Sequence, residues 1–84
     1  RTGNEGGLGK RLFVETASPP CGVCHSLEAA DAKGVIGPDL DALKPDARRI
    51  RTAIAQGVGA MPAYAEQLSD QEVTALVEFI TSSQ

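Results

Sequence analysis

The sequence has few of the residues that usually build a core. Its 84 residues contain no tryptophan and only three other aromatic side chains, Phe13, Tyr64 and Phe79, against nine glycines and five prolines. A chain of this length lies near the lower limit for folding alone, and small scaffolds commonly need a disulfide, a metal or a large cofactor. We therefore expect one domain over residues 1–84, with a loose glycine-rich N-terminal segment at 1–7, stabilised by a bound group.

Long apolar runs and an excess of positive charge are also missing. No stretch approaches the ~20 apolar residues that a membrane-spanning helix needs, so we expect no membrane span. The net charge is −3, which disfavours nucleic acid as a partner. Residues 1–51 hold all eight Lys and Arg against seven acidic residues, whereas residues 52–84 hold four acidic residues and no base. We expect this negative charge to lie on a solvated C-terminal helix.

Cysteine and histidine are scarce, and all of them fall in one segment. The segment PCGVCHSLE at 20–28 contains both cysteines, Cys21 and Cys24, and the single histidine, His25. A redox dithiol usually accompanies a βαβ pattern, which is absent here. A structural zinc site needs four ligands, and there is no second cluster of ligands. A disulfide between Cys21 and Cys24 would close a very small loop and would leave the thin core unexplained.

Covalent haem attachment fits the same cluster better. Cys-x-x-Cys-His is typical of c-type haem attachment. On a helical turn, Cys21 and Cys24 project to one side, where each can form a thioether with a porphyrin vinyl group. His25 follows directly and can present its imidazole to the iron. The sequence therefore predicts one covalently bound haem c, whose broad apolar faces would fill the core.

A closed iron site needs a second axial ligand. His25 is the only histidine, so a bis-histidine site is excluded. Met61 is the only methionine, and it lies in a loop with Gly57, Gly59 and Pro62. The competing interpretation is that Met61 fills a gap in the core. We predict that His25 and Met61 ligate the iron, and that the sulfur ligand raises its potential.

The rest of the chain predicts helices and loops. Leu8 to about Ala17 suits a short amphipathic helix, ended by Ser-Pro-Pro at 18–20. One or two helical turns are expected after His25, and then a loop over 34–43. We see no β-hairpin signal. The predicted fold is all-α, with three to five helices and long loops wrapped around one haem.

Two helices are predicted in the second half of the chain. One begins at Pro45 or Asp46 and ends at Gly57 in a left-handed conformation, with one apolar face formed by Ala47, Ile50 and Ile54. The other begins at Ser69, which forms a capping box with Glu72. Its apolar face carries the strongest helical periodicity in the chain, formed by Val73, Leu76, Val77 and Ile80.

Together these motifs resemble the small bacterial class I c-type cytochromes with a single haem. The resemblance spans nearly the whole chain, through GKRLF (9–13), CGVCH (21–25), GPDL (37–40), GAMPAY (59–64) and LSDQEVTALVEFI (68–80). It implies the small cytochrome c fold and an electron carrier rather than an enzyme. The chain departs from the family pattern between Phe13 and Cys21, where a segment containing ETASPP makes a longer connection.

The resemblance also implies roles for single residues. Gly9 would let the first and last helices approach closely, with Phe13 and Phe79 packing where they cross. The Pro38 carbonyl would accept the Nδ1 proton of His25 and orient the ring. Tyr64 would contact a haem propionate, although an exposed loop tyrosine is nearly as good an interpretation. Three basic residues would either neutralise the haem propionates or, as we favour, form a solvated helix face: Arg48, Arg49 and Arg51.

By the same resemblance, the protein would be soluble in the periplasm and would shuttle electrons. The donor would be a periplasmic dehydrogenase and the acceptor a terminal oxidase or another cytochrome in the respiratory chain. Two alternatives stay open: a tightly bound haem subunit of a dehydrogenase, for example a sulfite-oxidising one, and an open-site haem enzyme or sensor. Partners would dock on small apolar groups at the exposed haem edge, for which the candidates are Val23, Ala60, Pro62 and Ala63.

Overall fold

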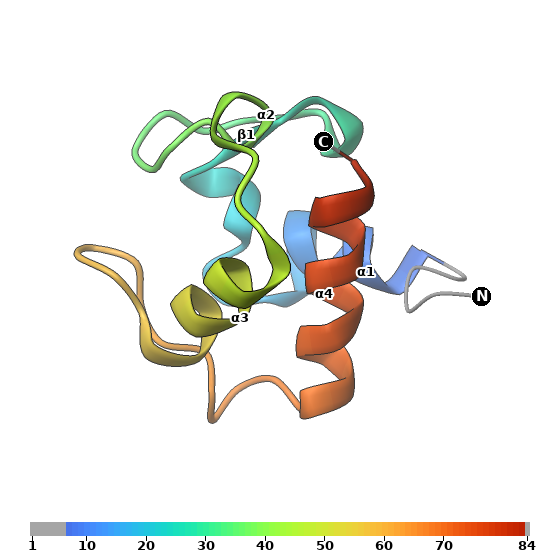
Figure 1. Ribbon diagram of the computed structural model, residues 1–84, viewed down its shortest axis with the longest axis vertical. Helices are drawn as coiled ribbons and strands as arrows, with labels where there is room; N and C mark the ends of the chain where they lie inside the picture. Colours follow the sequence, from blue (N-terminus) through green and yellow to red (C-terminus); the bar gives the residue numbers. More distant parts are fainter. Residues whose placement is uncertain (1–6, 84) are drawn as a thin grey trace.

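The C-terminal helix α4, Asp70–Ser82, is the element against which the first and third helices pack (Figure 1). The computed structural model describes residues 7–83. The N-terminal helix α1, Leu8–Arg11, and the third helix α3, Ala47–Gln56, both contact α4. The predicted loose segment at 1–7 lies outside the described residues except for Gly7.

The capping box of α4 is formed as predicted. The Glu72 backbone N–H donates to Ser69 Oγ at 3.1 Å, and the Ser69 backbone N–H donates to Glu72 Oε1 at 2.8 Å. These two bonds satisfy donors that the first turn of a helix cannot pair internally. The predicted apolar face is buried along its length, and it comprises Val73, Ala75, Leu76, Val77, Phe79 and Ile80.

The first helix has the predicted extent, but its second half is wider than an α-helix. α1 continues directly into a π-helical segment, η2, at Leu12–Thr16. The Ala17 N–H donates to the Leu12 carbonyl at 3.2 Å, which is the five-residue spacing of a π turn. This spacing aligns Leu12 and Ala17 on one side, and both are buried. The wider turn therefore lets both side chains reach the core.

The contact between the first and last helices matches the expectation. Gly9 is buried in α1, which packs against α4. Phe13 of η2 and Phe79 of α4 meet edge to face, with ring centroids 6.0 Å apart and an interplanar angle of 64°. This arrangement is favourable for two aromatic rings. Two of the three aromatic side chains of this chain thus lie at the contact between the first and last helical segments.

The segment after the cysteines differs from the prediction. A 3₁₀ turn at Cys21–Val23 (η3) is followed by β1, Ser26–Leu27, a second 3₁₀ turn at Glu28–Ala30 (η4), and β2, Ala32–Lys33. β1 and β2 pair antiparallel, with Leu27 opposite Ala32. One expected helical turn is present as η4, but it lies between two strands, so the expected absence of a hairpin is wrong here. Two residues per strand carry too little alternation to be detected in a sequence.

Two details of the middle of the chain also differ. The predicted loop over 34–43 ends in a short helix, α2, Leu40–Leu43, whose first turn is capped by Asp39 through the Asp41 N–H. α3 begins where predicted, because Asp46 Oδ1 accepts from the Arg49 N–H at 2.8 Å. Ala47 is exposed rather than part of the buried face, which Ile50 and Ile54 form.

Gly57 ends α3 in an extended conformation instead of the left-handed helical one, with φ 77° and ψ 162°. Only glycine adopts this conformation readily, because a side chain would be strained at that positive φ. A Cβ at this position would also lie 2.7 Å from the Met61 carbonyl oxygen and 2.9 Å from the Ala63 nitrogen. The chain therefore turns sharply at Gly57 and passes close to the backbone of residues 61–63, in the loop that carries the methionine.

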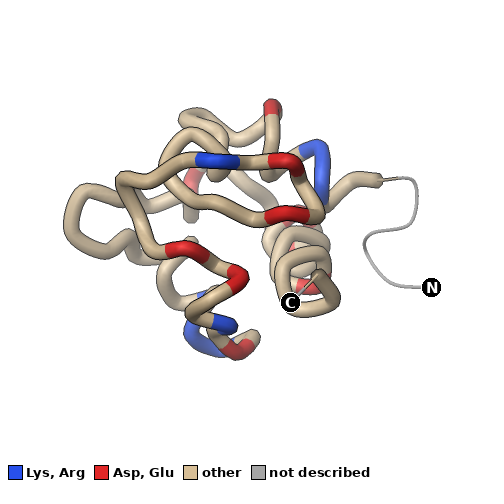
Figure 2. Tube along the Cα trace, turned by 90° about the horizontal axis from the view of Figure 1, so that it is seen from above, with Lys and Arg blue, Asp and Glu red and all other residues tan. Residues whose placement is uncertain are grey.

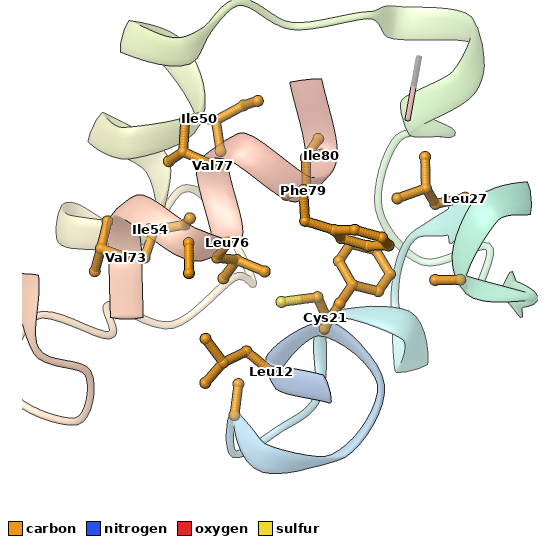
Figure 3. Packing of buried hydrophobic residues seen from close by; sticks show 14 of the residues in the cluster. Leu12, Cys21, Leu27, Ile50, Ile54, Val73, Leu76, Val77, Phe79 and Ile80 are labelled. Carbon is orange, nitrogen blue, oxygen red and sulfur yellow. The ribbon is translucent and has the colours of Figure 1, made fainter. Parts of the chain in front are cut away.

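The core forms between α4, α3 and the first helix (Figure 3). Leu12, Phe13, Leu27 and Leu76 are its largest fully buried side chains. In Figure 3 the Cys21 sulfur points into this packing between Leu12 and Leu76. Within residues 7–83, no helix is long and apolar enough to cross a membrane.

Charged residues are spread around the molecule. Figure 2 shows acidic and basic positions interspersed along the trace rather than segregated by sign. Two of the four acidic residues of the C-terminal part have local roles, since Glu72 caps α4 and Asp70 pairs with Arg51 at 3.2 Å. The predicted negative C-terminal helix is thus partly neutralised by α3.

Candidate functional site

One cavity of about 620 Å³ lies beside the cysteine turn. Cofactor sites commonly have volumes of ~300–1,000 Å³ and mostly apolar walls with a few polar groups. Most of the lining here is apolar and comes from four parts of the chain: the segment 19–25, the segment 36–45, helix α3 and the loop 58–64. Segments that are far apart in the sequence therefore meet around one space large enough for a cofactor.

The cysteines and the histidine present themselves to this cavity from one helical turn. The Cys24 N–H donates to the Cys21 carbonyl at 3.2 Å, and the His25 N–H donates to the same carbonyl at 2.9 Å. Cys21, Cys24 and His25 all line the cavity. The helical turn that the sequence analysis required for two thioether bonds is therefore present.

The structure does not favour the three other interpretations of this cluster, namely a disulfide, a redox dithiol and a zinc site. No disulfide joins Cys21 to Cys24. Burial raises the pKa of the Cys21 thiol to about 11, with a smaller contribution from Cys24, whereas a reactive redox thiol has a lowered pKa. No group of three or more His, Cys, Asp or Glu side chains that could hold a metal ion exists within the described chain.

A hydrogen bond fixes the imidazole of His25. Nδ1 lies 2.8 Å from the Pro38 carbonyl oxygen, and because a carbonyl can only accept, Nδ1 is the donor. The loop that carries Pro38 passes very close to the ring, since a Cβ on Gly37 would lie 2.5 Å from His25 Cε1. Gly34 makes a similar approach, with a Cβ position 2.5 Å from the Val23 carbonyl oxygen. Glycine at these two positions lets the loop run against the cysteine turn.

Met61 reaches the same cavity from a tight turn. Val58 and Met61 exchange two backbone hydrogen bonds, of 3.1 and 2.8 Å, across Gly59 and Ala60. Met61 is half-buried and packs against the core while it lines the cavity. The structure thus brings together all four residues that the sequence singled out for haem: Cys21, Cys24, His25 and Met61.

Tyr64 is buried rather than exposed, with only 4% of its surface accessible. Its hydroxyl donates to the Pro19 carbonyl at 2.7 Å, and the residue lines the cavity. Burial, followed by the proximity of Cys21 and Cys24, raises the pKa of Tyr64 to about 12. The alternative of an exposed loop tyrosine is therefore wrong.

The three arginines of α3 separate into two kinds. Arg48 and Arg49 line the cavity. Arg51 instead donates to Asp70 at 3.2 Å and to Thr74 Oγ1 at 2.8 Å, so it joins α3 to α4. The sequence could not make this distinction, because all three lie within four positions of one helix.

Several cavity residues were not anticipated. They are apolar and lie mostly in loops or short helices, where no periodicity marks a buried face: Pro19, Ile36, Leu40, Leu43 and Val58. Near Leu40, the only feature of the sequence that pointed to this site was the segment GPDL (37–40), through its resemblance to the cytochrome family. The donor set of one imidazole, one thioether and two thiols in an apolar cavity fits a covalently attached haem.

Comparisons with known proteins agree with this chemistry. The family described as cytochrome C oxidase, cbb3-type, subunit III matches residues 4–80. Cytochrome c-551 from Halorhodospira halochloris is 33% identical over 76 residues, covering 89% of this chain and 96% of that protein. The crystal structure of the c-type cytochrome SorU from Sinorhizobium meliloti superposes with a TM-score of 0.86 at 45% identity, covering 90% of this chain and 86% of the other. The chain therefore belongs to the small class I c-type cytochromes, electron carriers that bind one haem c covalently.

Proposed function

We propose that this cytochrome shuttles single electrons between a periplasmic dehydrogenase and a downstream acceptor such as a terminal oxidase. The observation that carries the proposal is that His25 and Met61 line one cavity together with both cysteines. Thioether bonds to Cys21 and Cys24 would hold the haem, and His25 and Met61 would be its axial ligands. The haem iron supplies a reversible one-electron change when bound.

The ligand set explains why we propose a carrier rather than an enzyme. Met61 would bind the iron opposite His25, as the sequence predicts, so the iron would not be accessible to a substrate or a gas. The Pro38 carbonyl would keep the His25 ring in one orientation and raise its basicity. The apolar walls would exclude water and so favour the less charged, reduced state. The sulfur ligand and the apolar walls would raise the potential, whereas stronger electron donation from His25 would lower it somewhat and strengthen the bond to iron.

The remaining cavity residues would bind the haem edge. Arg48 and Arg49 are the cations that line the cavity, so we propose that they neutralise the propionate carboxylates. Tyr64 would contact the haem with its ring, because its hydroxyl is already bound to Pro19. Arg51 is excluded from this role by its bonds to Asp70 and Thr74.

An exposed apolar rim would receive the redox partner. The four candidates from the sequence are all exposed: Val23, Ala60, Pro62 and Ala63. Val35, Ile36 and Val58 are also exposed, by 88%, 71% and 64%, and Ile36 and Val58 line the cavity. Redox encounters commonly use small interfaces, below ~1,200 Å², which such a rim can supply.

A permanent subunit is the second candidate. The matching family is described by an oxidase subunit, which supports tight association with a larger redox enzyme. A sulfite-oxidising or other dehydrogenase is the alternative host. Copurification at low concentration tests this: a subunit stays with its enzyme on dilution, whereas a shuttle separates from it.

Three measurements test the carrier function itself. Mass spectrometry of the native protein should show the polypeptide plus one haem. The absorption spectrum of the oxidised protein should contain the weak long-wavelength band of a sulfur-ligated ferric haem. A redox titration should give one reversible one-electron step. A bare polypeptide mass, or an oxidised protein that binds small ligands at once, would contradict the proposal.

A further inference from the structure

The methionine loop is tied to the rest of the protein by very few hydrogen bonds. Within residues 7–83, the backbone bonds of Val58 and Met61 are with each other, and those of Gln67 and Leu68 are with Tyr64. Among the residues that the structure describes, the bonds that leave loop 58–68 are made by Tyr64 and Gln67. Gly59, Ala60, Pro62 and Ala63 are exposed, so Met61 is the residue through which this turn packs against the core.

Three of these bonds go to one short segment, Ser18–Pro19. The Gln67 side chain pairs with Ser18 in both directions: Nε2 donates to the Ser18 carbonyl at 2.9 Å, and Oε1 accepts from the Ser18 N–H. The Tyr64 hydroxyl donates to the Pro19 carbonyl at 2.7 Å. The fourth bond, from the Tyr64 N–H to the Ile54 carbonyl at 2.7 Å, goes to α3.

The segment that receives these bonds leads directly into the haem-attachment turn. It belongs to ETASPP, the stretch by which this chain departs from the usual family pattern, and Cys21 follows it. Pro19, Cys21, Met61 and Tyr64 all line the cavity. The bonds therefore join the part of the chain that would anchor the haem to the part that would supply the sulfur ligand.

We propose that Gln67 and Tyr64 are positioning residues, which bind Ser18 and Pro19 and thereby hold the Met61 sulfur in place as the axial ligand. The inference rests on the proposed ligand role of Met61. Weakening these bonds lets the loop move away more often without unfolding the rest of the domain. An external ligand such as imidazole then competes with Met61 more effectively, because the state in which Met61 is detached from the iron is more populated.

Imidazole titration of the oxidised holoprotein tests this. Gln67→Ala removes both bonds to Ser18, and Tyr64→Phe removes the bond to Pro19 while keeping the ring. Each variant should bind imidazole about five- to tenfold more tightly, the effect of losing one or two hydrogen bonds of ordinary net strength. Gln67→Glu keeps the oxygen that accepts from Ser18 and loses the donor, so its affinity should fall between those of the parent and Gln67→Ala.

Gln71→Ala is the matched control. Gln71 is an exposed glutamine in the first turn of α4, and its side chain makes no hydrogen bond within the described residues. The Gln71→Ala variant should bind imidazole with the same affinity as the parent protein. Hydrogen exchange gives a second readout, in which the Tyr64 amide should exchange faster in Gln67→Ala while amides in the middle of α4 do not change.

Two outcomes would overturn the inference. One is an unchanged imidazole affinity in Gln67→Ala and Tyr64→Phe. The other is an equal increase in the Gln71→Ala control, which would indicate general destabilisation. The failure of the underlying function is distinguishable, because a parent protein without the sulfur-ligation band would show that Met61 is not a ligand at all.

Discussion

The imidazole of His25 donates its Nδ1 proton to the carbonyl oxygen of Pro38, over 2.8 Å. This bond leaves Nε2 as the nitrogen with a free lone pair, so the tautomer suited to bind iron is set by the backbone of a loop 13 residues away. Proline suits the position because it keeps its carbonyl and loses only its N–H.

Gly37→Ala should disturb this arrangement. The new Cβ would lie 2.5 Å from His25 Cε1 and 2.8 Å from Nδ1, so either the ring or the loop must shift. Overpacking of this kind costs about 1–3 kcal/mol, which denaturant unfolding of the holoprotein would detect. Pro38→Ala is the control, since it keeps the accepting carbonyl and should change the histidine ring resonances less. Equal, small effects of both changes would argue against close packing at Gly37.

Met61→Ala should give a protein that keeps its haem, because both cysteines are untouched. It should lose the sulfur-ligation band, fall in potential and bind carbon monoxide readily. Leu8→Ala is a matched control, since Leu8 is the other partly buried side chain that packs against the core, and it should keep the band and the potential. A Met61→Ala protein with the parent's potential and ligand inertness would show that the axial assignment is wrong.

Replacing Arg48 and Arg49 together by Gln should lower the reduction potential. Loss of two positive charges beside the haem would stabilise the oxidised, more positive state. The shift should shrink at high salt, because both side chains are exposed. Arg51→Gln should instead reduce the stability by breaking the bonds to Asp70 and Thr74, with little change in potential. Redox titration and unfolding on the same three proteins separate the two roles.

Ser69→Ala should lower the free energy of unfolding by about 1 kcal/mol, the usual effect of losing an N-cap side chain. The change removes the acceptor of the Glu72 N–H and one half of the capping box. Ser69→Asp should retain most of the stability, because Asp caps equally well and its charge is favourable at a helix N-terminus. Denaturant midpoints compare the three proteins, and an Asp variant as unstable as the Ala variant would refute the capping account.

The raised pKa of Tyr64 predicts that the free energy of unfolding falls at alkaline pH. Its pKa is raised to about 12 in the folded protein, from an ordinary value of 10.0, mainly by burial. Above pH ~10 the unfolded chain loses the tyrosine proton while the folded chain keeps it, so stability falls as the pH rises toward ~12. Below ~10 the contribution is fully present. Tyr64→Phe should flatten the unfolding free energy over this range, and a slope equal to the parent's would contradict the prediction.

The accuracy of the sequence-based predictions varied with the strength of the local signal. α4 was predicted correctly because its cap, Ser69 with Glu72, and its apolar periodicity lie within a single element. α3 began at the predicted cap residue, Asp46. The β1–β2 hairpin was missed because its pairing of Leu27 with Ala32 depends on burial against the core and gives no local pattern.

The wide turn at η2 was missed for a related reason. Leu12 and Phe13 fit an ordinary helix in the sequence, and only the position of the core beneath Leu12 and Ala17 favours the π-helical spacing. The three arginines of α3 were indistinguishable in the sequence as well. Their different roles depend on where α3 lies relative to α4 and to the cavity.

The sequence by itself determined the chemistry of this protein. One histidine, one methionine and two cysteines in a Cys-x-x-Cys-His spacing leave few alternatives, because each function needs particular donor atoms and no others are present. The resemblance already implied that Pro38 orients His25, but only the tertiary structure decided that Gln67 and Tyr64 bind Ser18 and Pro19 and so join the Met61 loop to that segment. The contacts of Tyr64 and Gln67 join residues 45 and 49 positions apart through backbone carbonyls, which every residue carries and which therefore leave no mark in a sequence.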